Sequence, residues 1–443
     1  MKIRITLAGL VAGLAVFPTW AQLQTDYIQT NASEQVDEYL LDLYKHFHTH
    51  PELSFYEKET SARVAQELTK AGCDEVMTDI GGYGVLGIMR NGKGKTVMVR
   101  ADMDALPVQE ATGLDYASTV TTEDDQGNTV YTMHACGHDV HMTSLIGTAR
   151  MLGSTRNKWK GTVIFLGQPA EERGGGADAM LKDGLLEKIP LPDYALALHT
   201  SASLPAGHVG YVSGYAMANV NSVDIHIKGQ GGHGAYPHTT KDPVVLAAKI
   251  ILSLQTIVSR EVSPLDPAVV TVGSIHGGTK HNIIGNDVHL QLTLRSYTEE
   301  VRVALIEKIK RICNGEAMAS GIPEEMWPEV TVFEGTPSLY NDPVLTEKAI
   351  AAVGKVLQTE NIHALSPVMG GEDFSRYGMT QEDIPIFLFW LGGVPQEKYD
   401  MAQAGEINLP SLHSALFYPD PEPTLTTGVQ SMVSIVNSLL LEK

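Results

Sequence analysis

The sequence is poor in cysteine and in positive charge, and both shortages exclude classes of protein. Only three cysteines occur among 443 residues, Cys73, Cys136 and Cys313. Three cysteines are too few, and odd in number, to build a disulfide framework, although the sequence leaves pairing of Cys73 with Cys313 open. Lysine and arginine number 32 against 52 aspartate and glutamate residues, for a formal charge of −20. This balance disfavours nucleic acid and anionic membranes as partners, because phosphate binding needs a basic surface.

Long apolar runs are also scarce, and the most conspicuous one lies at the N-terminus. Lys2 and Arg4 precede an apolar run from Ile5 to Phe17, and small residues flank Trp20. The run is short for a membrane span, so Met1–Ala21 predicts a secretory signal peptide better than a retained anchor. Removal of this segment takes away two positive charges and leaves a formal net charge of −22. We expect an exported protein, periplasmic or secreted, with no stable membrane anchor.

Three familiar catalytic or cofactor motifs are missing or out of place. No Gly-x-Ser-x-Gly occurs, so a serine hydrolase of that kind has no nucleophile motif. No His-Glu-x-x-His occurs, which excludes the helix-borne zinc protease pattern. The segment Gly229–Gly234 has dinucleotide-fingerprint spacing, but the next helix begins only near Pro243, too late to present its N-terminus to a pyrophosphate.

Hydrophobic periodicity predicts an α/β sheet in the first half of the chain. Helical spacing runs from Ser33 to Lys70 with a break at Pro51. Strands and helices then alternate: strands Val85–Arg90, Thr96–Ala101, Thr162–Gly167 and Tyr194–His199, and helices Val140–Leu152 and Ala177–Asp183. The Asn91–Gly94 turn between the first two strands suggests a hairpin. Alternation of this kind favours largely buried strands with active groups at their ends.

The pattern changes after about Tyr215. A strand-helix-strand-strand-helix order appears, with one more strand expected near Val330, which is typical of a ferredoxin-like module. The segments are Ser222–Lys228, Pro243–Ser259, Val269–Ile275, Val288–Tyr297 and Glu299–Ser320. Helix Pro343–Leu357, strand Ile386–Leu391 and helix Pro423–Leu441 follow.

The chain length favours two domains, and the placement of the candidate site residues suggests how they are arranged. His413 lies near the C-terminus, whereas its expected co-ligands lie before residue 200. We therefore expect a catalytic domain in two parts, residues 33–214 and 330–443. Residues 215–329 would form an inserted lid or dimerisation domain.

Two short stretches hold most of the chemistry. His134–Asp139 places a thiol and an imidazole, Cys136 and His138, two positions apart in a glycine-containing loop before a helix. By itself this pattern is more often structural than metal-binding. Glu171 and Glu172, however, follow an apolar strand and would repel each other unless a cation neutralised one. Neighbouring side chains on an extended segment point apart, so one can bind metal and the other can activate water.

Further residues of ligand type complete the pattern. His199 ends a third apolar run, and His413 near the C-terminus could close a two-metal site. Asp104 follows the strand Thr96–Ala101 and is a candidate to orient a ligand histidine, with a simple turn aspartate equally open. The cluster of His46, His48 and His50 lies at a helix end and is interpreted as structural.

Six motifs in order resemble one family. They are Arg100–Pro107 (RADMDALP), His134–Asp139 (HACGHD), Gln168–Glu172 (QPAEE), Gly231–His238 (GGHGAYPH), Gly371–Phe374 (GEDF) and Leu412–Ser414 (LHS). The chain is similar to metal-dependent amidohydrolases of the aminoacylase/carboxypeptidase type. The motifs resemble those of the branch that contains hippurate hydrolases, N-acyl-amino-acid amidohydrolases and plant indole-acetyl-amino-acid hydrolases. The resemblance extends from about His46 to the C-terminus.

This resemblance implies a role for each motif residue. Cys136 would bridge two divalent ions, with the remaining ligands being His138, Glu172, His199 and His413. Glu171 would be the general base and Asp104 would hold a ligand in place. His233 of the small domain would stabilise the oxyanion, commonly from the partner subunit of a homodimer, and Asn282 and Arg295 would bind the substrate carboxylate.

The sequence departs from the family pattern at three positions. Gly285 replaces a usual proline, Gly234 a common alanine, and Arg173 a common glycine. The first two affect backbone more than chemistry. Because Arg173 lies beside the acidic pair, the family resemblance leaves the substrate specificity open.

The function predicted from these observations is metal-dependent hydrolysis of small N-acyl amino acids to a carboxylate and a free amino acid. Zn²⁺ or Mn²⁺ suits the ligand types, and Co²⁺ or Ni²⁺ is open. A dipeptidase or carboxypeptidase on the same fold is an alternative. A periplasmic metal- or peptide-binding protein without activity is another, which Glu171 disfavours because a pure binder needs no base.

Overall fold

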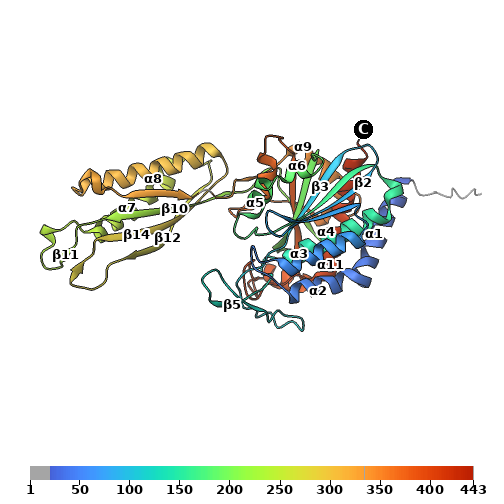
Figure 1. The fold of residues 1–443 in the computed structure, drawn as a ribbon, viewed down its shortest axis with the longest axis horizontal. Coiled ribbons are helices and arrows are strands. Elements are labelled where there is room, and N and C mark those ends of the chain that lie inside the picture. The colour runs from blue at the N-terminus through green and yellow to red at the C-terminus, as the bar shows by residue number, and fades with distance from the viewer. Residues whose placement is uncertain (1–19, 334, 443) are drawn as a thin grey trace, which may run out of the picture.

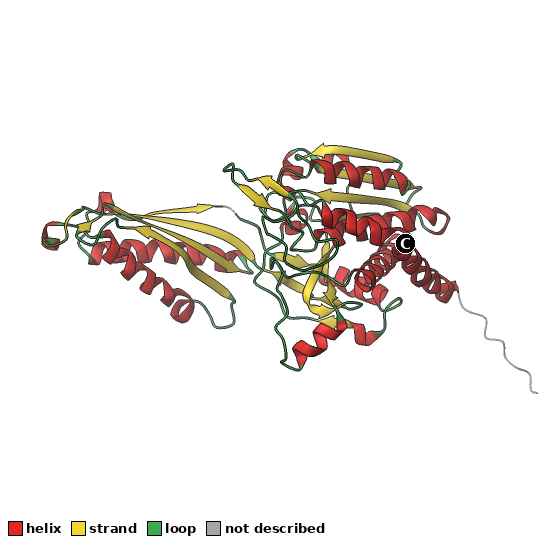
Figure 2. Ribbon diagram, turned by 90° about the horizontal axis from the view of Figure 1, so that it is seen from below, coloured by secondary structure: helices red, strands yellow, loops and turns green. Residues whose placement is uncertain are grey.

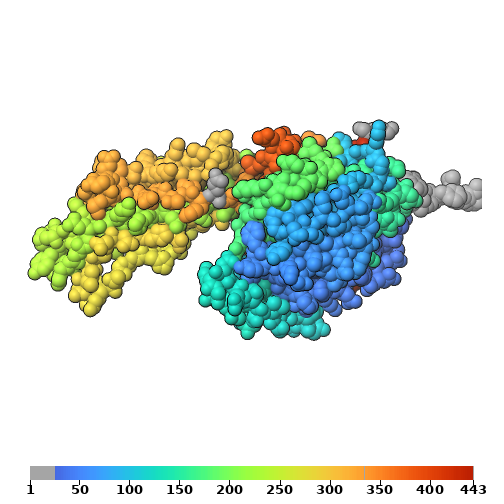
Figure 3. Space-filling model, in the orientation of Figure 1, coloured from blue at the N-terminus to red at the C-terminus, as the bar shows by residue number. Residues whose placement is uncertain are grey.

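The computed structural model describes residues 20–333 and 335–442. Figure 1 shows two bodies side by side, a larger one built on a twisted sheet and a smaller elongated one. The space-filling view in Figure 3 shows that one end of the smaller body adjoins the larger one. The predicted signal peptide, Met1–Ala21, lies almost wholly outside the described residues, and helix α1 begins at Trp20.

The larger body contains an eight-stranded sheet in the order β1-β2-β6-β3-β7-β18-β8-β17. The four central strands β6, β3, β7 and β18 are parallel, and β1, β2 and β8 add antiparallel pairs toward the edges. The bounds are β1 Glu75–Ile80, β2 Gly84–Asn91, β3 Thr96–Asp102, β6 Gly161–Gln168, β7 Tyr194–Pro205, β8 Val209–Tyr211, β17 Ile362–Ala364 and β18 Ile386–Val394. The central strands are buried on both faces, as expected for parallel strands between helices.

Helices cover both faces of this sheet (Figure 2). On β3, Val97 and Val99 face one hydrophobic core while Met98 faces another, because successive side chains of a strand point to opposite sides. The first core packs against α1 Trp20–Gln35, α2 Leu41–Thr49, α3 Lys58–Lys70, α4 His138–Ser154, α9 Pro343–Val353 and α11 Pro421–Leu440. The second packs against α5 Gly176–Lys182, α6 Leu185–Lys188 and the 3₁₀ segment η7 Asp373–Met379.

The smaller body is a four-stranded antiparallel sheet with two helices on one face (Figure 2). Its strand order, β12-β14-β10-β15, is that of a ferredoxin-like fold with the predicted chain order. The elements are β10 Asn219–Lys228, α7 Pro243–Thr256, β12 Ala268–Gly277, β14 Asp287–Ser296, α8 Glu299–Ala319 and β15 Glu329–Phe333. Burial alternates along β10, and Asp242 and Thr298 cap the two helices through backbone N–H groups.

Short elements complete the chain. They are η1 Val36–Leu40, β4 Thr121–Glu123, β5 Thr129–Tyr131, η2 Arg156–Lys158, β9 Gly214–Met217, β11 Gly232–His233, η3 Pro237–Thr239, η4 Ile257–Glu261, β13 Ile283–Ile284, η5 Glu324–Met326, β16 Leu339–Asn341, η6 Thr359–Asn361 and α10 Gln396–Gln403. The predicted fold class, an α/β catalytic body with an inserted ferredoxin-like module, is confirmed by this architecture.

One expectation from the sequence is wrong, and one possibility that the sequence left open is excluded. The Asn91–Gly94 turn does not form a hairpin, because β6 lies between β2 and β3 and pairs with both. Cys73 and Cys313 are free. They belong to different bodies, Cys73 beside the first core of the sheet and Cys313 in the core of the ferredoxin-like module.

Candidate dinuclear metal centre

The loop that precedes α4 turns two ligand-type side chains toward the carboxyl ends of the central strands. Gly137 lies between Cys136 and His138 with a φ of +82°, and a Cβ added there would lie 2.9 Å from Thr200 Oγ1. Glycine alone adopts this conformation readily, so the residue type permits the tight turn. Cys136 and His138 are both buried, 6% and 0% exposed.

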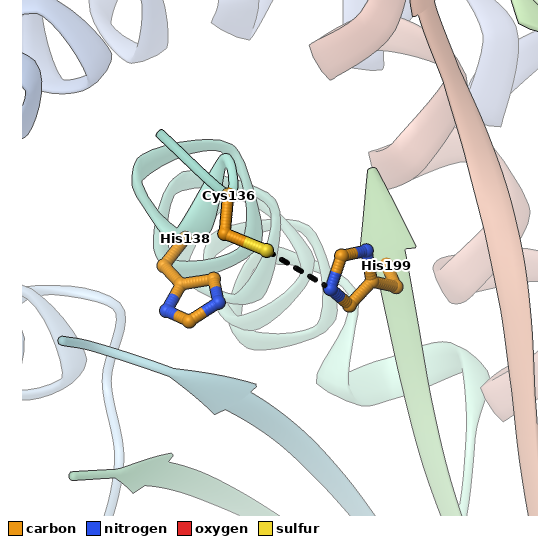
Figure 4. Close-up of side chains that lie close together, drawn as sticks. All are labelled: Cys136, His138 and His199. Atoms are coloured by element: carbon orange, nitrogen blue, oxygen red, sulfur yellow. Dashed lines mark hydrogen bonds between the residues drawn. The ribbon is translucent and has the colours of Figure 1, made fainter. Parts of the chain in front are cut away.

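The five predicted ligands come together from four separate parts of the chain. Cys136 Sγ lies 3.6 Å from His199 Nε2 on β7, as Figure 4 shows, and 3.3 Å from His413 Nε2. Glu172, in the turn after β6, lies between two of the imidazoles. Its Oε2 is 3.4 Å from His413 Nε2, and its Oε1 is 3.8 Å from His138 Nε2.

The unsatisfied atoms of this cluster fit bound cations. Among the described residues, His138 Nε2 and Glu172 Oε1 are buried without any hydrogen-bond partner, which is rare for polar atoms. The opposite ring nitrogens are already engaged: His138 Nδ1 with the Asp104 carbonyl oxygen at 2.8 Å and His199 Nδ1 with the Thr200 carbonyl oxygen at 2.8 Å. Such outward hydrogen bonds orient Nε2 toward a metal.

The donor types also fit divalent metal ions. A thiol, three imidazoles and a carboxylate form a mixed set of soft, borderline and hard donors that suits zinc and its neighbours. Burial, together with the charges of Glu172 and Glu171, raises the pKa of the Cys136 thiol well above its ordinary value. A thiolate at this position therefore requires a compensating cation.

Asp104 holds the backbone of the acidic pair. Its two carboxylate oxygens accept from Glu171 N at 3.1 Å and Glu172 N at 3.0 Å. Ser54 Oγ donates to the same carboxylate at 2.6 Å. Since Asp104 also contacts His138 through its carbonyl, one residue connects a ligand histidine with the acidic pair.

The two neighbouring glutamates both lie near His138 but differ in their other partners. Glu172 lies beside His138 and His413, whereas Glu171 lies near His138 and within 4.8 Å of carboxylate oxygens of Glu372 and Asp373. Burial, followed by the charges of Glu372 and Glu172, raises the pKa of Glu171 well above its usual range. Glu171 is thereby suited to accept and return a proton.

A buried network behind the ligands was not predicted from the sequence. Arg100 Nη1 donates to Asp102 Oδ2 at 2.6 Å, and its Nη2 donates to Glu372 Oε1 at 2.9 Å. Asp102 Oδ1 lies 2.6 Å from His141 Nδ1, and His141 Nε2 accepts from Thr200 N at 2.8 Å. The sequence contained a sign of this, because His141 is three residues after His138 on the same helical face and Asp102 ends β3.

A cavity of about 940 Å³ opens over the cluster. Its lining includes both glutamates, and Arg295 contributes from the ferredoxin-like module. His233 and Asn282 do not line it. They are exposed residues at the β11–β13 end of that module, remote from the larger sheet in Figure 1. The structure therefore does not bring these two residues to the site of their own chain.

Comparison with known proteins places this site in a family. Residues 98–413 match the model of peptidase family M20/M25/M40. The chain belongs to this family. The match spans the motifs from the end of β3 to His413, so recognition of the amidohydrolase group from sequence is confirmed.

Members of family M20/M25/M40 with similar sequences act on amide bonds. The N-acetylcysteine deacetylase of Bacillus subtilis is 37% identical over 356 residues, 80% of this chain and 88% of the relative. The IAA-amino acid hydrolase ILR1-like 2 of Arabidopsis thaliana is 34% identical over 360 residues, 81% of this chain and 79% of the relative.

A solved structure of the same family supports the fold and the two-metal character of the site. The YXEP protein of Bacillus subtilis, described as a dinuclear metal-binding peptidase, superposes with a TM-score of 0.73. It is 30% identical, and the alignment covers 94% of this chain and 99% of that one. The fold is therefore one on which dinuclear sites are built.

Proposed function

We propose that this protein hydrolyses the amide bond of N-acyl amino acids and releases a carboxylic acid and a free amino acid. The observation that supports this best is a pair of neighbouring glutamates beside the cluster of ligand types. Glu172 lies next to Cys136, His138 and His413, and Glu171 is a buried carboxyl with a raised pKa next to Glu372 and Asp373. The names of the relatives, a deacetylase of N-acetylcysteine and a hydrolase of IAA-amino acids, point to the same substrate class.

Each chemical step has a residue suited to it. Two divalent metal ions held by Cys136, His138, Glu172, His199 and His413 would supply an activated water and polarise the amide carbonyl. Glu171 takes the proton that the attacking water loses as its oxygen bonds to the amide carbon. When the C–N bond breaks, Glu171 returns that proton to the departing nitrogen, so the amine leaves neutral.

Arg295 is suited to hold the substrate carboxylate. It is half-buried in the cavity wall, and its guanidinium donates only to Thr293 Oγ1 at 2.8 Å and the Leu294 carbonyl at 3.1 Å among described residues. No described carboxylate pairs with it, and burial lowers its pKa. An incoming carboxylate would supply the missing counter-charge. Apolar lining residues, Trp390, Met217 and Val368, suit the acyl group.

We also propose that the protein is a homodimer in which His233 acts in the partner's active site. His233 is distant from its own cavity, and α7 presents exposed apolar residues, Val244, Val245 and Leu252, on its outer face. An apolar helical face of this kind suits association of two copies.

The helical segment Pro243–Glu261 is long and apolar enough to span a membrane, but one face of it packs on the core of its module.

Mixed dimers test this arrangement. Glu171→Gln and His233→Ala subunits, each inactive alone, are refolded or exchanged together at equal amounts. If His233 acts across the interface, random mixing restores about a quarter of the wild-type activity, because half of the dimers contain one intact site. A mixture that stays inactive while forming heterodimers contradicts the proposal.

Export is proposed on the N-terminal pattern alone. A periplasmic or secreted protein whose first residue is Gln22 is the expected product of cleavage after Ala21. N-terminal sequencing of protein recovered from the periplasm and from the medium tests it. Recovery of the full N-terminus from the cytoplasm alone contradicts it.

The reaction is tested with a panel of N-acetyl, N-benzoyl and indole-acetyl amino acids. Protein lacking residues 1–21 is loaded with Zn²⁺ or Mn²⁺, and release of free amino acid is measured beside a chelated control. Chelator-sensitive release supports the proposal and begins to define the acyl group. Turnover of dipeptides with a free amine, and not of acylated substrates, would instead favour a dipeptidase.

A further inference from the structure

The turn that bears the acidic pair contains a strained residue. Ala170 immediately precedes Glu171 and has a φ of +51°, in the left-handed region that residues other than glycine rarely adopt. Ala170 is fully buried. Such a conformation persists only where surrounding contacts impose it, and it is found most often at functional sites. The contacts that impose it here therefore bear on the placement of Glu171.

Glu57 supplies one of these contacts from the N-terminus of α3. Its Oε1 accepts a hydrogen bond from Ala170 N at 2.8 Å, across 113 residues of sequence. The side chain is 0% exposed, and its Oε2 is a buried oxygen with no hydrogen-bond partner among the described residues. Glu57 forms no ion pair within the described chain. A carboxyl buried in this way is costly, and stability alone gives no reason for it.

Glu57 and Asp104 together hold three successive backbone N–H groups. Ala170 N donates to Glu57, while Glu171 N and Glu172 N donate to the two oxygens of Asp104. The carbonyl of Ala170 in turn accepts from Gly175 N and Gly176 N. The backbone groups on both sides of the peptide between Ala170 and Glu171 are thus hydrogen-bonded. The direction in which the Glu171 side chain points depends on these contacts.

We propose that Glu57 is a positioning residue for the general base. By holding Ala170 N–H it keeps the turn in the left-handed conformation from which Glu171 extends toward Glu372 and Asp373, and Glu172 toward His413. This rests on the proposed function of Glu171. Burial and the charge of Asp104 raise the pKa of Glu57 to about 7, which agrees with a role as acceptor that needs no negative charge.

Three substitutions separate this role from a structural one. Glu57→Gln keeps an oxygen acceptor of the same reach, Glu57→Leu removes the acceptor with little change in size, and Glu57→Asp shortens the reach by one methylene. Glu59→Leu is the matched control, since Glu59 is an exposed residue in the first turn of the same helix. For each variant, kcat, KM, metal content and thermal stability are measured with the panel's best substrate.

The expected result is a kcat effect without a matching KM or metal effect. Glu57→Leu should lower kcat by about 10- to 100-fold, the range that a small misplacement of a catalytic group costs. KM should change less than about threefold, bound metal should stay at the wild-type level, and Glu57→Gln should retain most of the wild-type kcat. Should Glu57→Leu fail to fold, Glu57→Asp should show a smaller loss of the same kind.

Ala170→Gly provides a rescue. Glycine adopts the left-handed conformation without strain, so Glu57→Leu combined with Ala170→Gly should recover part of the lost kcat. Wild-type kcat in Glu57→Leu, a kcat loss explained by lost metal, or equal losses in Glu57→Leu and Glu57→Gln would each overturn the proposal.

Hydrogen exchange gives a readout that does not depend on the substrate. In Glu57→Leu, amides of the 168–176 segment should exchange faster than in wild type, while those of β3 and β7 remain protected. Unchanged exchange in this segment overturns the proposal whatever the activity. If instead the wild type hydrolyses nothing in the panel while the exchange difference is present, the proposed function fails and the role of Glu57 in holding the turn stands.

Discussion

His413 Nε2 lies 3.3 Å from Cys136 Sγ, although 277 residues separate the two in sequence. The backbone contributes to this proximity, since His413 N donates to the Ala135 carbonyl at 2.8 Å. His413 has a φ of +65°, an uncommon conformation for a residue that is not glycine. The segment that follows the inserted module thus closes a site begun by residues before it, and the candidate centre exists only in the complete fold.

Replacement of the central thiol should empty the metal site. Cys136→Ser substitutes a poorly ionised hydroxyl for the one sulfur that contacts both His199 and His413. We expect loss of at least one metal ion per chain by elemental analysis, and a fall in kcat/KM on the order of 100-fold or more, as removal of several kcal/mol of metal assistance implies. Substitution of the buried but remote Cys313 by Ser should leave metal content unchanged. Equal metal content in Cys136→Ser and wild type would contradict the assignment.

Glu171→Gln should separate metal binding from catalysis. The amide keeps the size of the side chain but cannot take up a proton, and Glu172 remains in place for the ligand cluster. We expect metal content equal to wild type and a kcat lower by about 100- to 10,000-fold, the usual contribution of a general base. Metal analysis and steady-state kinetics on the same preparation check this. Activity within a few fold of wild type would show that another group is the base.

Arg295→Gln should weaken recognition of the substrate carboxylate. We expect the KM for an N-acyl amino acid to rise by about 10-fold or more, since a charge-assisted hydrogen bond to an ion contributes roughly 1.5 to 3 kcal/mol. The corresponding N-acyl amino acid amide should be a poor substrate of both proteins and should show no such rise. Arg260→Gln, an exposed arginine on the same module, is the matched control.

His48 should make stability depend on alkaline pH. Burial by itself would lower its pKa, but the hydrogen bonds and charges of Asp139 and Glu110 outweigh burial and raise the pKa to about 9. The folded state therefore binds the proton more tightly than the unfolded chain, whose histidine titrates near 6.5. This stabilisation is complete below about pH 6.5 and is lost as pH rises through about 9; it amounts to about 3 kcal/mol.

Urea unfolding between pH 6 and pH 10 measures this contribution. The fall in unfolding free energy across that range should be smaller in His48→Gln than in wild type. His50→Gln, an exposed neighbour, should follow wild type. Parallel curves for His48→Gln and wild type would mean that His48 is not protonated in the folded protein.

Gly137→Ala should disturb the metal site more than an equally left-handed glycine elsewhere. Gly137 and Gly113 have φ values of +82° and +78°, but only at Gly137 would the new Cβ meet other atoms, those of Thr200. Both alanines should cost roughly 1 to 2 kcal/mol of stability from the backbone conformation. Only Gly137→Ala should also lower metal content, because it moves Cys136 and His138. Equal metal content in the two variants would argue against this role of the loop.

Local sequence patterns were sufficient to predict most helices and strands and the order of the elements in the ferredoxin-like module. The alternation in Ser222–Lys228 and the helical periodicity from Pro243 depend on near neighbours, and the structure has β10 and α7 there. Strand pairing depends on residues far apart in sequence, which is why the predicted hairpin is wrong. Strand β6, some seventy residues further along the chain, lies between β2 and β3. The residues Asn91–Gly94 contain no information about a strand that lies so far along the chain.

The sequence by itself determined the chemistry available to this protein: the ligand types, the paired glutamates and the family. Apart from Asp104, which the sequence already indicated, tertiary structure alone decided which groups orient them. Glu57 meets Ala170 across 113 residues, and Arg100 meets Glu372 across 272. It also placed His233 and Asn282 away from the cavity of their own chain. The reason is physical, because residue type sets what an atom can bind, whereas buried partners far apart in sequence are chosen by how the strands and helices pack.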